Sequence, residues 1–395
     1  MARAQDQPEP AEGDEAGEGA PRPRLQAAAR PEWSLPVLTD EGLERLRTLL
    51  QMARQAGATD LLLAAGSPPT VRIHGDLKPL VPAPLEADES ARLCSALVPR
   101  ERRPALAADG SVDVAFTLAG TGRCRGNVHR ERGGWAAAVR LLAPITQSIE
   151  DLNLPSEMAR LAEFRHGLVL ATGPAGSGKS TTIAALLAMI TARRAAHVIT
   201  IEDPIEYEHP QGMSIVEQVE VGRDSPSFAA ALRAAMRQDP DVLVVGEMRD
   251  PETIALALTA AETGHLVFST LHTGDAAQSV SRILDGHPAG QSTFVRSQVA
   301  ASLAAVVTQI LLPRADARGR VPAVEILVSD DAVKNLIRKG QTEQITQQIT
   351  LSRERGMRSL DHSLAELVRR QLVDPAEARA RARNPKEFHL LLSGS

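Results

Sequence analysis

Aromatic residues are scarce in this chain, which has two Trp, one Tyr and six Phe among 395 residues. A hydrophobic core must therefore be filled by Ala, Leu and Val. The scarcity also removes the stacking surfaces on which single-stranded nucleic acids bind. A formal net charge of −5 offers no general attraction to a phosphate backbone or to an anionic membrane surface. Composition thus disfavours a nucleic-acid-binding protein.

Cysteines and long apolar runs are also scarce. Cys94 and Cys124 are the two cysteines, which suits a reducing compartment and excludes a four-cysteine zinc module. No apolar run approaches the roughly 18 residues that a membrane-spanning helix needs. The longest, residues 299–312, is interrupted by polar side chains and predicts a buried helix. An acidic, polar start in place of a signal peptide adds to the expectation of a cytoplasmic protein without a transmembrane segment.

The length of the chain predicts two folded domains with tails. Residues 1–35 are rich in Pro, Gly, Ala, Glu and Arg and predict a disordered tail. Residues 36–145 predict a small α+β domain that begins with an amphipathic helix at 41–56, with Asp40 as its N-cap. Its expected strands are 60–64, 70–73, 111–118 and 135–142. A linker is expected at 146–154.

Residues 155–325 alternate strand and helix signals. The expected strands are the near-continuous apolar runs 167–172, 197–202, 241–247 and 266–270, and the expected helices between them include 180–194 and 227–238. Such runs are typical of strands buried on both faces. The alternation predicts an α/β fold with a parallel sheet wrapped by helices. Residues 326–395 predict a helical C-terminal extension.

The strongest motif is GPAGSGKS at residues 173–180, which fits the pattern GxxxxGK[ST]. It follows the strand LVLAT and opens a helix, so its backbone N–H groups and the helix dipole would face an anion. Lys179 would contact the β and γ phosphates of ATP, and the Ser180 hydroxyl suits a Mg²⁺ ligand. The predicted nucleotide-binding residues are Gly173, Pro174, Ala175, Gly176, Ser177, Gly178, Lys179, Ser180 and Thr181.

Two carboxylates follow predicted strands whose carboxyl ends should face the same crevice. Glu202 ends the strand 197–202, and Glu247 follows the strand that begins at 241. One carboxylate can bind Mg²⁺, directly or through water, while the other polarises the attacking water. The sequence does not decide which carboxylate has which role, but it favours Glu247 for polarising the water. It also leaves open whether Asp203 and Glu206 take part in the site.

Histidines and arginines supply further candidates. His272 lies at the carboxyl end of the strand 266–270, where a γ-phosphate sensor would stand, whereas His265 at its other end is a weaker candidate. Arg125 and Arg140 of the first domain are candidates to complete a site across a domain interface, because guanidinium groups stabilise charge on a transferring phosphoryl group. The other arginines considered are Arg233, Arg237 and Arg249.

Three ordered segments around the phosphate loop resemble the boxes of the type IV pilus retraction ATPases, the PilT family of secretion-type ATPases. TIEDPIEY at 200–207 resembles the Asp box, GEMRD at 246–250 the atypical Walker B motif, and the segment 259–276 the His box. The resemblance runs from Asp60 to Phe388. AVKNLIRK at 332–339 resembles the retraction motif AIRNLIRE, with Lys339 where an acidic residue is usual.

The resemblance implies an ATP-hydrolysing, Mg²⁺-dependent motor that powers pilus retraction and twitching motility. It implies a homo-hexamer in which each subunit pairs a PAS-like domain with a RecA-like domain, with Arg125 and Arg140 matching family arginines at the closing ATP site. It also implies a peripheral location at the cytoplasmic face of the inner membrane, a platform protein there as partner, and a paralogous ATPase as a further partner.

Alternative functions remain open on the sequence. One is an accessory retraction ATPase or an assembly ATPase of a related filament or secretion system. Another is a nucleotide-gated docking platform with little catalysis. A RecA-type nucleic-acid motor is disfavoured by the charge and the few aromatics. The lack of a four-cysteine insert argues against pilus-extension and type II secretion ATPases.

Overall fold

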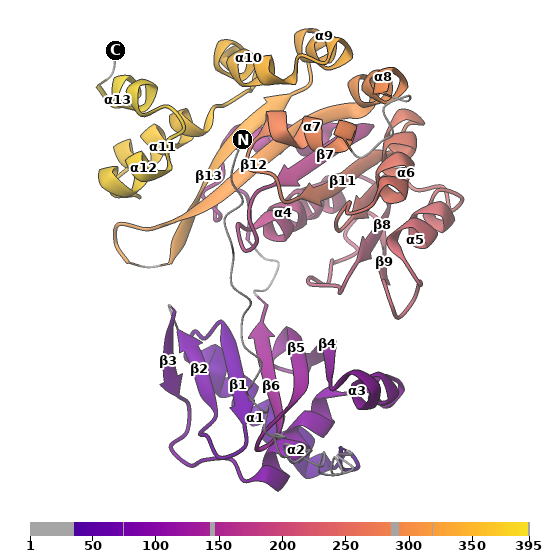
Figure 1. Cartoon of the computed structure of the whole chain (residues 1–395), viewed down its shortest axis with the longest axis vertical. Coiled ribbons are helices and arrows are strands. Elements are labelled where there is room, and N and C mark those ends of the chain that lie inside the picture. Colours follow the sequence, from indigo (N-terminus) through magenta and orange to yellow (C-terminus); the bar gives the residue numbers. More distant parts are fainter. Residues whose placement is uncertain (1–34, 74, 143–146, 286–291, 318, 394–395) are drawn as a thin grey trace, which may run out of the picture. The chain divides into compact units, whose positions relative to one another are not determined.

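The computed structural model describes residues 35–393, apart from 74, 143–146, 286–291 and 318. Two β-sheets organise these residues, one formed by strands from 60–141 and one by strands from 167–328 (Figure 1). The expected disordered tail lies outside the described residues except for residue 35. Within the described ranges, no helix has the length and apolar character needed to cross a membrane.

The first helix, α1 (Asp40–Gln55), begins after a threonine cap. The Thr39 hydroxyl accepts a hydrogen bond from the Gly42 backbone N–H at 3.2 Å, so the prediction of Asp40 as N-cap was wrong by one residue. Asp40 is instead the first helical residue, where its carboxylate faces the positive end of the helix dipole.

The first sheet has six antiparallel strands in the order β3-β2-β1-β6-β5-β4. The strands are β1 (Asp60–Ala64), β2 (Thr70–Ile73), β3 (Asp76–Pro79), β4 (Ser111–Leu118), β5 (Gly122–Glu131) and β6 (Gly134–Leu141). The helices are α1, α2 (Ala87–Leu97) and α3 (Arg103–Asp109), with the short η1 (Arg100–Arg102). The four strands expected here are confirmed, the last shifted by one residue. The sequence DLKP of β3 is exposed along its whole length and is too short and polar to show a clear alternation of apolar and polar residues, the pattern that predicts a strand.

The second sheet has the order β13-β12-β7-β11-β10-β8-β9. Its strands are β7 (Gly167–Thr172), β8 (His197–Glu202), β9 (Ile215–Glu220), β10 (Val242–Val245), β11 (Leu266–Leu271), β12 (Leu303–Pro313) and β13 (Arg320–Val328). Every neighbouring pair from β12 to β9 is parallel, and β13 is antiparallel to β12. The predicted parallel sheet is confirmed, with one antiparallel strand added at its edge.

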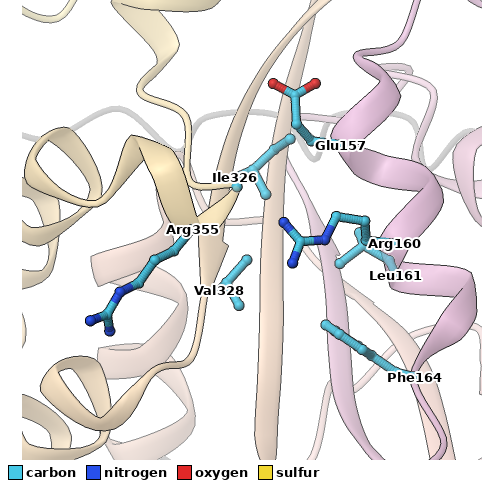
Figure 2. Close-up of a pocket in the computed structure, with 8 residues that line it drawn as sticks. Glu157, Arg160, Leu161, Phe164, Ile326, Val328 and Arg355 are labelled. Atoms are coloured by element: carbon cyan, nitrogen blue, oxygen red, sulfur yellow. The ribbon is translucent and has the colours of Figure 1, made fainter.

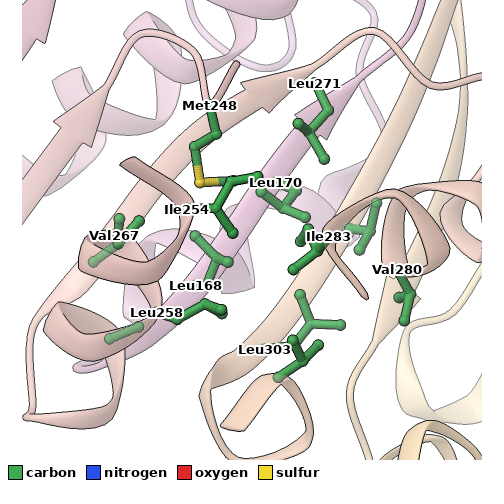
Figure 3. Packing of buried hydrophobic residues seen from close by; sticks show 14 of the residues in the cluster. Leu168, Leu170, Met248, Ile254, Leu258, Val267, Leu271, Val280, Ile283 and Leu303 are labelled. Atoms are coloured by element: carbon green, nitrogen blue, oxygen red, sulfur yellow. The ribbon is translucent and has the colours of Figure 1, made fainter. Parts of the chain in front are cut away.

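Helices cover both faces of this sheet. They are η2 (Ser156–Glu163), α4 (Lys179–Arg193), α5 (Phe228–Ala235), α6 (Pro251–Glu262), α7 (Ala276–Asp285) and α8 (Ser292–Ser302). In β7, Leu168 and Leu170 pack with α6, while the alternate residues pack with α4 and η2. Figure 3 shows Ile254 and Leu258 of α6 gathered beside these two leucines. Burial on both faces explains why the strands read as continuous apolar runs.

The prediction of a buried helix over 299–312 was wrong. Helix α8 ends at Ser302 and β12 begins at the next residue. Along β12, Val306 packs against one face of the sheet's core and Ala305 and Val307 against the other. A fully buried strand shows no alternation of apolar and polar residues, so periodicity alone does not separate it from a buried helix.

The described residues beyond β13 form a helical region, as predicted. Its elements are α9 (Asp331–Lys339), η4 (Thr342–Gln344), α10 (Ile345–Leu351), η5 (Arg353–Arg355), α11 (Leu360–Arg369), α12 (Pro375–Arg381) and α13 (Pro385–Ser393). Leu364 and Ala365 of α11 pack with Val321 and Ala323 of β13. Lys339 is exposed at the carboxyl end of α9, where a positive charge is favourable to the helix dipole.

Candidate nucleotide-binding site

The glycine-rich loop leaves the sheet at the carboxyl end of β7 and runs directly into α4. Gly173 and Gly178 have φ angles of 133° and 91°, which side chains rarely adopt. A Cβ on Gly173 would lie 2.2 Å from the Gln309 carbonyl oxygen, and one on Gly178 would lie 2.7 Å from Gln309 Nε2. Both positions therefore require glycine, because the loop packs closely against β12.

Gln309 holds this loop in place and was not identified from the sequence. Its side chain is buried, and Nε2 donates to the Ser177 carbonyl at 2.7 Å. Its Oε1 accepts from the Thr182 hydroxyl at 2.8 Å, and one residue earlier Thr308 shares a hydrogen bond of 2.9 Å with Thr172. The sequence did contain a sign of this role, because Thr308 and Gln309 are adjacent polar residues within the apolar run of β12. Buried polar groups need specific partners.

The loop has the features of a phosphate cradle. Ser177 Oγ is buried and has no hydrogen-bond partner among the described residues. Lys179 Nζ folds back to donate to the Gly173 and Pro174 carbonyls at 2.8 and 3.0 Å. Helix α4 begins after Gly178 without a side-chain cap, so its first N–H groups stay open to an anion. These residues fit the phosphates of a nucleotide.

Glu247 lies beside this loop, at the end of β10. Its position follows from two backbone contacts of Gly246, which donates to the Ile201 carbonyl at 2.8 Å and accepts from the Thr270 hydroxyl at 2.6 Å. Glu247 is 15% exposed, and one carboxylate oxygen lies 2.6 Å from Arg249 Nε. Burial lowers the pKa of Lys179, while the negative charges of Glu247 and then Glu206 oppose that shift. The ammonium and the two carboxylates thus share one electrostatic environment.

His272 joins the same group of charges. Its Nε2 lies 3.9 Å from Glu247 Oε2. Partial burial lowers the pKa of His272, the positive Lys179 and Arg249 lower it further, and Glu247 opposes them. The imidazole is therefore neutral at pH 7 and can donate a hydrogen bond without carrying charge. His265 sits at the opposite end of β11, where Nδ1 lies 2.9 Å from the Ala260 carbonyl.

Glu202 and Glu206 occupy different surroundings. Glu202 accepts hydrogen bonds from the Thr200 hydroxyl at 2.7 Å, from Gln218 Nε2 at 3.2 Å and from the Glu206 backbone N–H at 3.3 Å. Burial raises the pKa of Glu202, and these hydrogen bonds oppose the shift. The side chain of Glu206 is the one that faces Lys179 electrostatically.

A tyrosine ties this acidic turn to the phosphate loop. The Tyr207 hydroxyl and the Thr181 hydroxyl are 2.7 Å apart, and the Tyr207 carbonyl accepts from Gln218 Nε2 at 2.7 Å. The chain has one tyrosine. Because Thr181 belongs to the first turn of α4, this hydrogen bond connects the turn after Glu202 directly to the nucleotide-binding helix.

Arg125 and Arg140 are directly opposite each other on β5 and β6. Arg140 Nε lies 3.0 Å from Asp60 Oδ1, and Arg125 Nη1 lies 3.9 Å from Glu206 Oε1. Like charges opposite each other on paired strands are unfavourable, and each arginine lies near a carboxylate that offsets its charge. By contrast, Arg233 pairs with Glu252 in an ordinary surface ion pair.

Oxygen ligands for a hard cation lie next to the phosphate loop. Ser180 is exposed in the first turn of α4, and the carboxylates of Glu206 and Glu247 lie beside Lys179. Across the described part of the chain, no cluster of three His, Cys, Asp or Glu residues could hold a metal. Mg²⁺ bound through one or two protein oxygens, water and substrate phosphates needs no such cluster, so the residues fit that cation.

A separate cavity between η2 and β13 is too small for a nucleotide. Its volume is about 30 Å³, comparable to one water molecule. Figure 2 shows that Arg160 and Arg355 border it together with apolar side chains such as Phe164 and Val328. None of its lining residues belongs to the phosphate loop, so this cavity is distinct from the candidate site.

The glycine loop between a central parallel strand and a helix, with Lys179 beside strand-end carboxylates, defines a P-loop nucleotide-binding protein. The sequence profile of the family "Type II/IV secretion system protein" matches residues 134–378. The chain belongs to this family of secretion ATPases.

Similar proteins include a twitching motility protein and a pilus retraction ATPase. The chain is 45% identical to the twitching motility protein of Neisseria gonorrhoeae, over 81% of this chain and 86% of that protein. It is 41% identical to the type IV pilus retraction ATPase PilT of Pseudomonas aeruginosa, over 86% of this chain and 98% of that protein. A crystal structure of the pilus retraction motor PilT with bound ADP matches with a TM-score of 0.79 and 42% identity, covering 87% of this chain and 98% of that one.

Replacing Gln309 with Leu should weaken nucleotide binding. The change removes two hydrogen bonds that fix the loop, each worth about 1 kcal/mol, so we expect the dissociation constant for ATP to rise by up to about 30-fold. Isothermal titration calorimetry would measure it. Gln298→Leu is the matched control, because Gln298 makes its hydrogen bond to Glu262 on the surface of α8. Equal affinity in wild type and Gln309→Leu would contradict the role of Gln309.

Proposed function

We propose that this protein is the ATP-hydrolysing motor that powers type IV pilus retraction and thereby twitching motility. The observation that carries the proposal is the convergence of Lys179, Glu247 and His272 beside a glycine loop, in a chain that belongs to the secretion ATPases. Strong similarity to PilT over most of both chains supports the particular function.

The phosphates of ATP bind to the N–H groups of residues 173–181, and the Lys179 ammonium leaves the loop carbonyls to contact the β and γ phosphates. The cost of that exchange is small, because two hydrogen bonds to carbonyls are replaced by charge-assisted contacts to phosphate oxygens. Burial of Lys179 strengthens its attraction to the phosphates.

Glu247 orients the attacking water and accepts its proton. Its carboxylate is 15% exposed and lies 2.6 Å from Arg249 Nε, at the strand end that faces the phosphate loop. His272, neutral at pH 7, stands 3.9 Å from Glu247 and donates a hydrogen bond to the γ-phosphate. Glu247 and His272, which follow β10 and β11, thereby distinguish ATP from ADP by the presence of the γ-phosphate.

Ser180 would hold Mg²⁺, and Glu202 would support the cation through a water. A carboxylate offers about four acceptor positions, and three of those on Glu202 are engaged by protein donors. The cation, when bound, neutralises charge on the phosphate oxygens.

Arg125 and Arg140 neutralise further phosphate charge when a PAS-like domain (36–145) closes on a RecA-like domain (155–325). Closure of one domain on the other supplies the work. The motor acts as a homo-hexamer at the cytoplasmic face of the inner membrane, on a platform protein of the pilus machine and alongside a paralogous ATPase.

Replacing Glu202 with Gln should raise the Mg²⁺ concentration needed for half-maximal ATP turnover. Because outer-sphere partners of a metal contribute roughly 10–100-fold to its affinity, we expect a shift of about tenfold, measured by Mg²⁺ titration at saturating ATP. Glu217→Gln on the exposed side of β9 is the control. An unchanged Mg²⁺ requirement in Glu202→Gln would remove Glu202 from the metal site.

A strain that lacks the gene tests the cellular function. It should carry excess surface pili and fail to twitch, and wild-type protein should restore both properties. Lys179→Ala should restore neither, whereas the exposed Lys78→Ala should restore both, as scored by pilus counts in electron micrographs and by twitching zones. Normal pilus numbers in the deletion strain would contradict a main retraction role and favour an accessory motor or a docking platform.

A further inference from the structure

The loop from His272 to Ala276 joins β11 to α7 and carries the histidine of the nucleotide site. Three of its hydrogen bonds are local: Thr273 to Ser279 at 2.6 Å, the Gly274 N–H to Gln278 at 3.3 Å, and the Gln278 N–H to Asp275 at 2.7 Å. These contacts tie the loop to the first turn of α7. They do not fix it relative to the sheet.

Two residues from distant parts of the chain supply that connection. The Ala276 N–H donates to Glu325 Oε1 of β13 at 2.9 Å. Arg383, which lies between α12 and α13, donates from Nη2 to the Gly274 carbonyl at 2.6 Å and from Nη1 to Glu325 Oε2. One guanidinium thus bridges the loop and the carboxylate that caps α7.

The position of Arg383 is itself fixed by the C-terminal helices. The buried carboxylate of Asp361, in α11, accepts from the Arg383 backbone N–H and from the Asn384 backbone N–H, each at 2.8 Å. Helix α11 also packs on β13 through Leu364. The helical region therefore reaches the loop of His272 through a short chain of direct contacts.

The chemistry of this pair argues for a role beyond stability. Glu325 is 2% exposed in its side chain, and burial raises its pKa while Arg383 opposes that shift. Buried ion pairs are often no more stable than apolar residues of the same size. What the pair does provide is geometry, because the planar guanidinium donates to two acceptors in fixed directions.

We propose that Arg383, supported by Glu325, is a positioning residue that holds the His272 loop in the geometry needed for ATP hydrolysis. The C-terminal helices are thereby coupled to the chemical step, since a displacement of α11 or α13 moves Arg383 and with it the loop. This inference rests on the proposed role of His272 at the γ-phosphate.

The first test compares Arg383→Gln with wild type in the purified full-length protein. A loop misplaced by about 1 Å can cost up to roughly 100-fold in rate, and we expect kcat for ATP hydrolysis to fall about tenfold. The dissociation constant for ATP should change less than about twofold, because the phosphate loop is untouched. Arg370→Gln, which changes a half-exposed arginine of the same region paired with Glu366, should leave both quantities at wild-type values.

A second variant separates positioning from stability. Arg383→Gln alone leaves the Glu325 carboxylate buried without its partner and should lower the melting temperature. Glu325→Gln combined with Arg383→Gln removes both charges, and the melting temperature should recover towards wild type. If Arg383 positions the loop, kcat stays low in this combined variant. Recovery of kcat together with stability would overturn the proposal.

A third comparison tests whether Arg383 acts through His272. His272→Ala should lower kcat, and adding Arg383→Gln to it should cost little more, since the residue being positioned is already gone. If the decreases in kcat caused by His272→Ala and Arg383→Gln add fully in the combined variant, the proposal is overturned. Wild-type turnover in His272→Ala would instead refute the proposed function of that histidine and, with it, Arg383's action through it. Low turnover in His272→Ala with normal turnover in Arg383→Gln would refute the further inference alone.

Discussion

The close approach of the phosphate loop to β12 is the constraint on which the site depends. With the Gln309 carbonyl 2.2 Å from where a Cβ of residue 173 would stand, the loop tolerates only glycine there and sits in one place. β12 is in turn held between β7 and β13. The sheet that forms the core therefore also holds the loop whose N–H groups are offered to the phosphates.

The same sheet explains why charged groups gather at one edge. Parallel strands bring their carboxyl ends together, so Lys179 after β7, Glu247 after β10 and His272 after β11 meet without long-range adjustment of the chain. Their charges act on one another: burial, Lys179 and Arg249 lower the pKa of His272, and Glu247 and Glu206 oppose the lowering of the Lys179 pKa by burial. A carboxylate, an imidazole and an ammonium gathered in this way suit phosphoryl transfer to water.

Much of this arrangement could be predicted from local sequence. The GPAGSGKS segment and the apolar strands before it were sufficient to place Lys179 at the mouth of a parallel sheet, and the strand ends placed Glu247 and His272 there. Gln309 and Tyr207 could not be assigned in this way, because their roles depend on partners 127–132 and 26 residues away, respectively, along the chain. The strand β12 was mistaken for a helix because a strand buried on both faces loses the alternation that identifies it. Asp40 was mistaken for the N-cap because the neighbouring Thr39 also has a side-chain oxygen that can accept a hydrogen bond from the helix N-terminus.

The central claim is that a water activated by Glu247 attacks a nucleotide held by the Lys179 loop. The most direct measurement is ATP hydrolysis in Glu247→Gln, followed together with the equilibrium binding of ATP. The account predicts loss of turnover by at least about 100-fold with ATP affinity within about threefold of wild type. Turnover close to wild type, or loss of binding in step with loss of turnover, would contradict it.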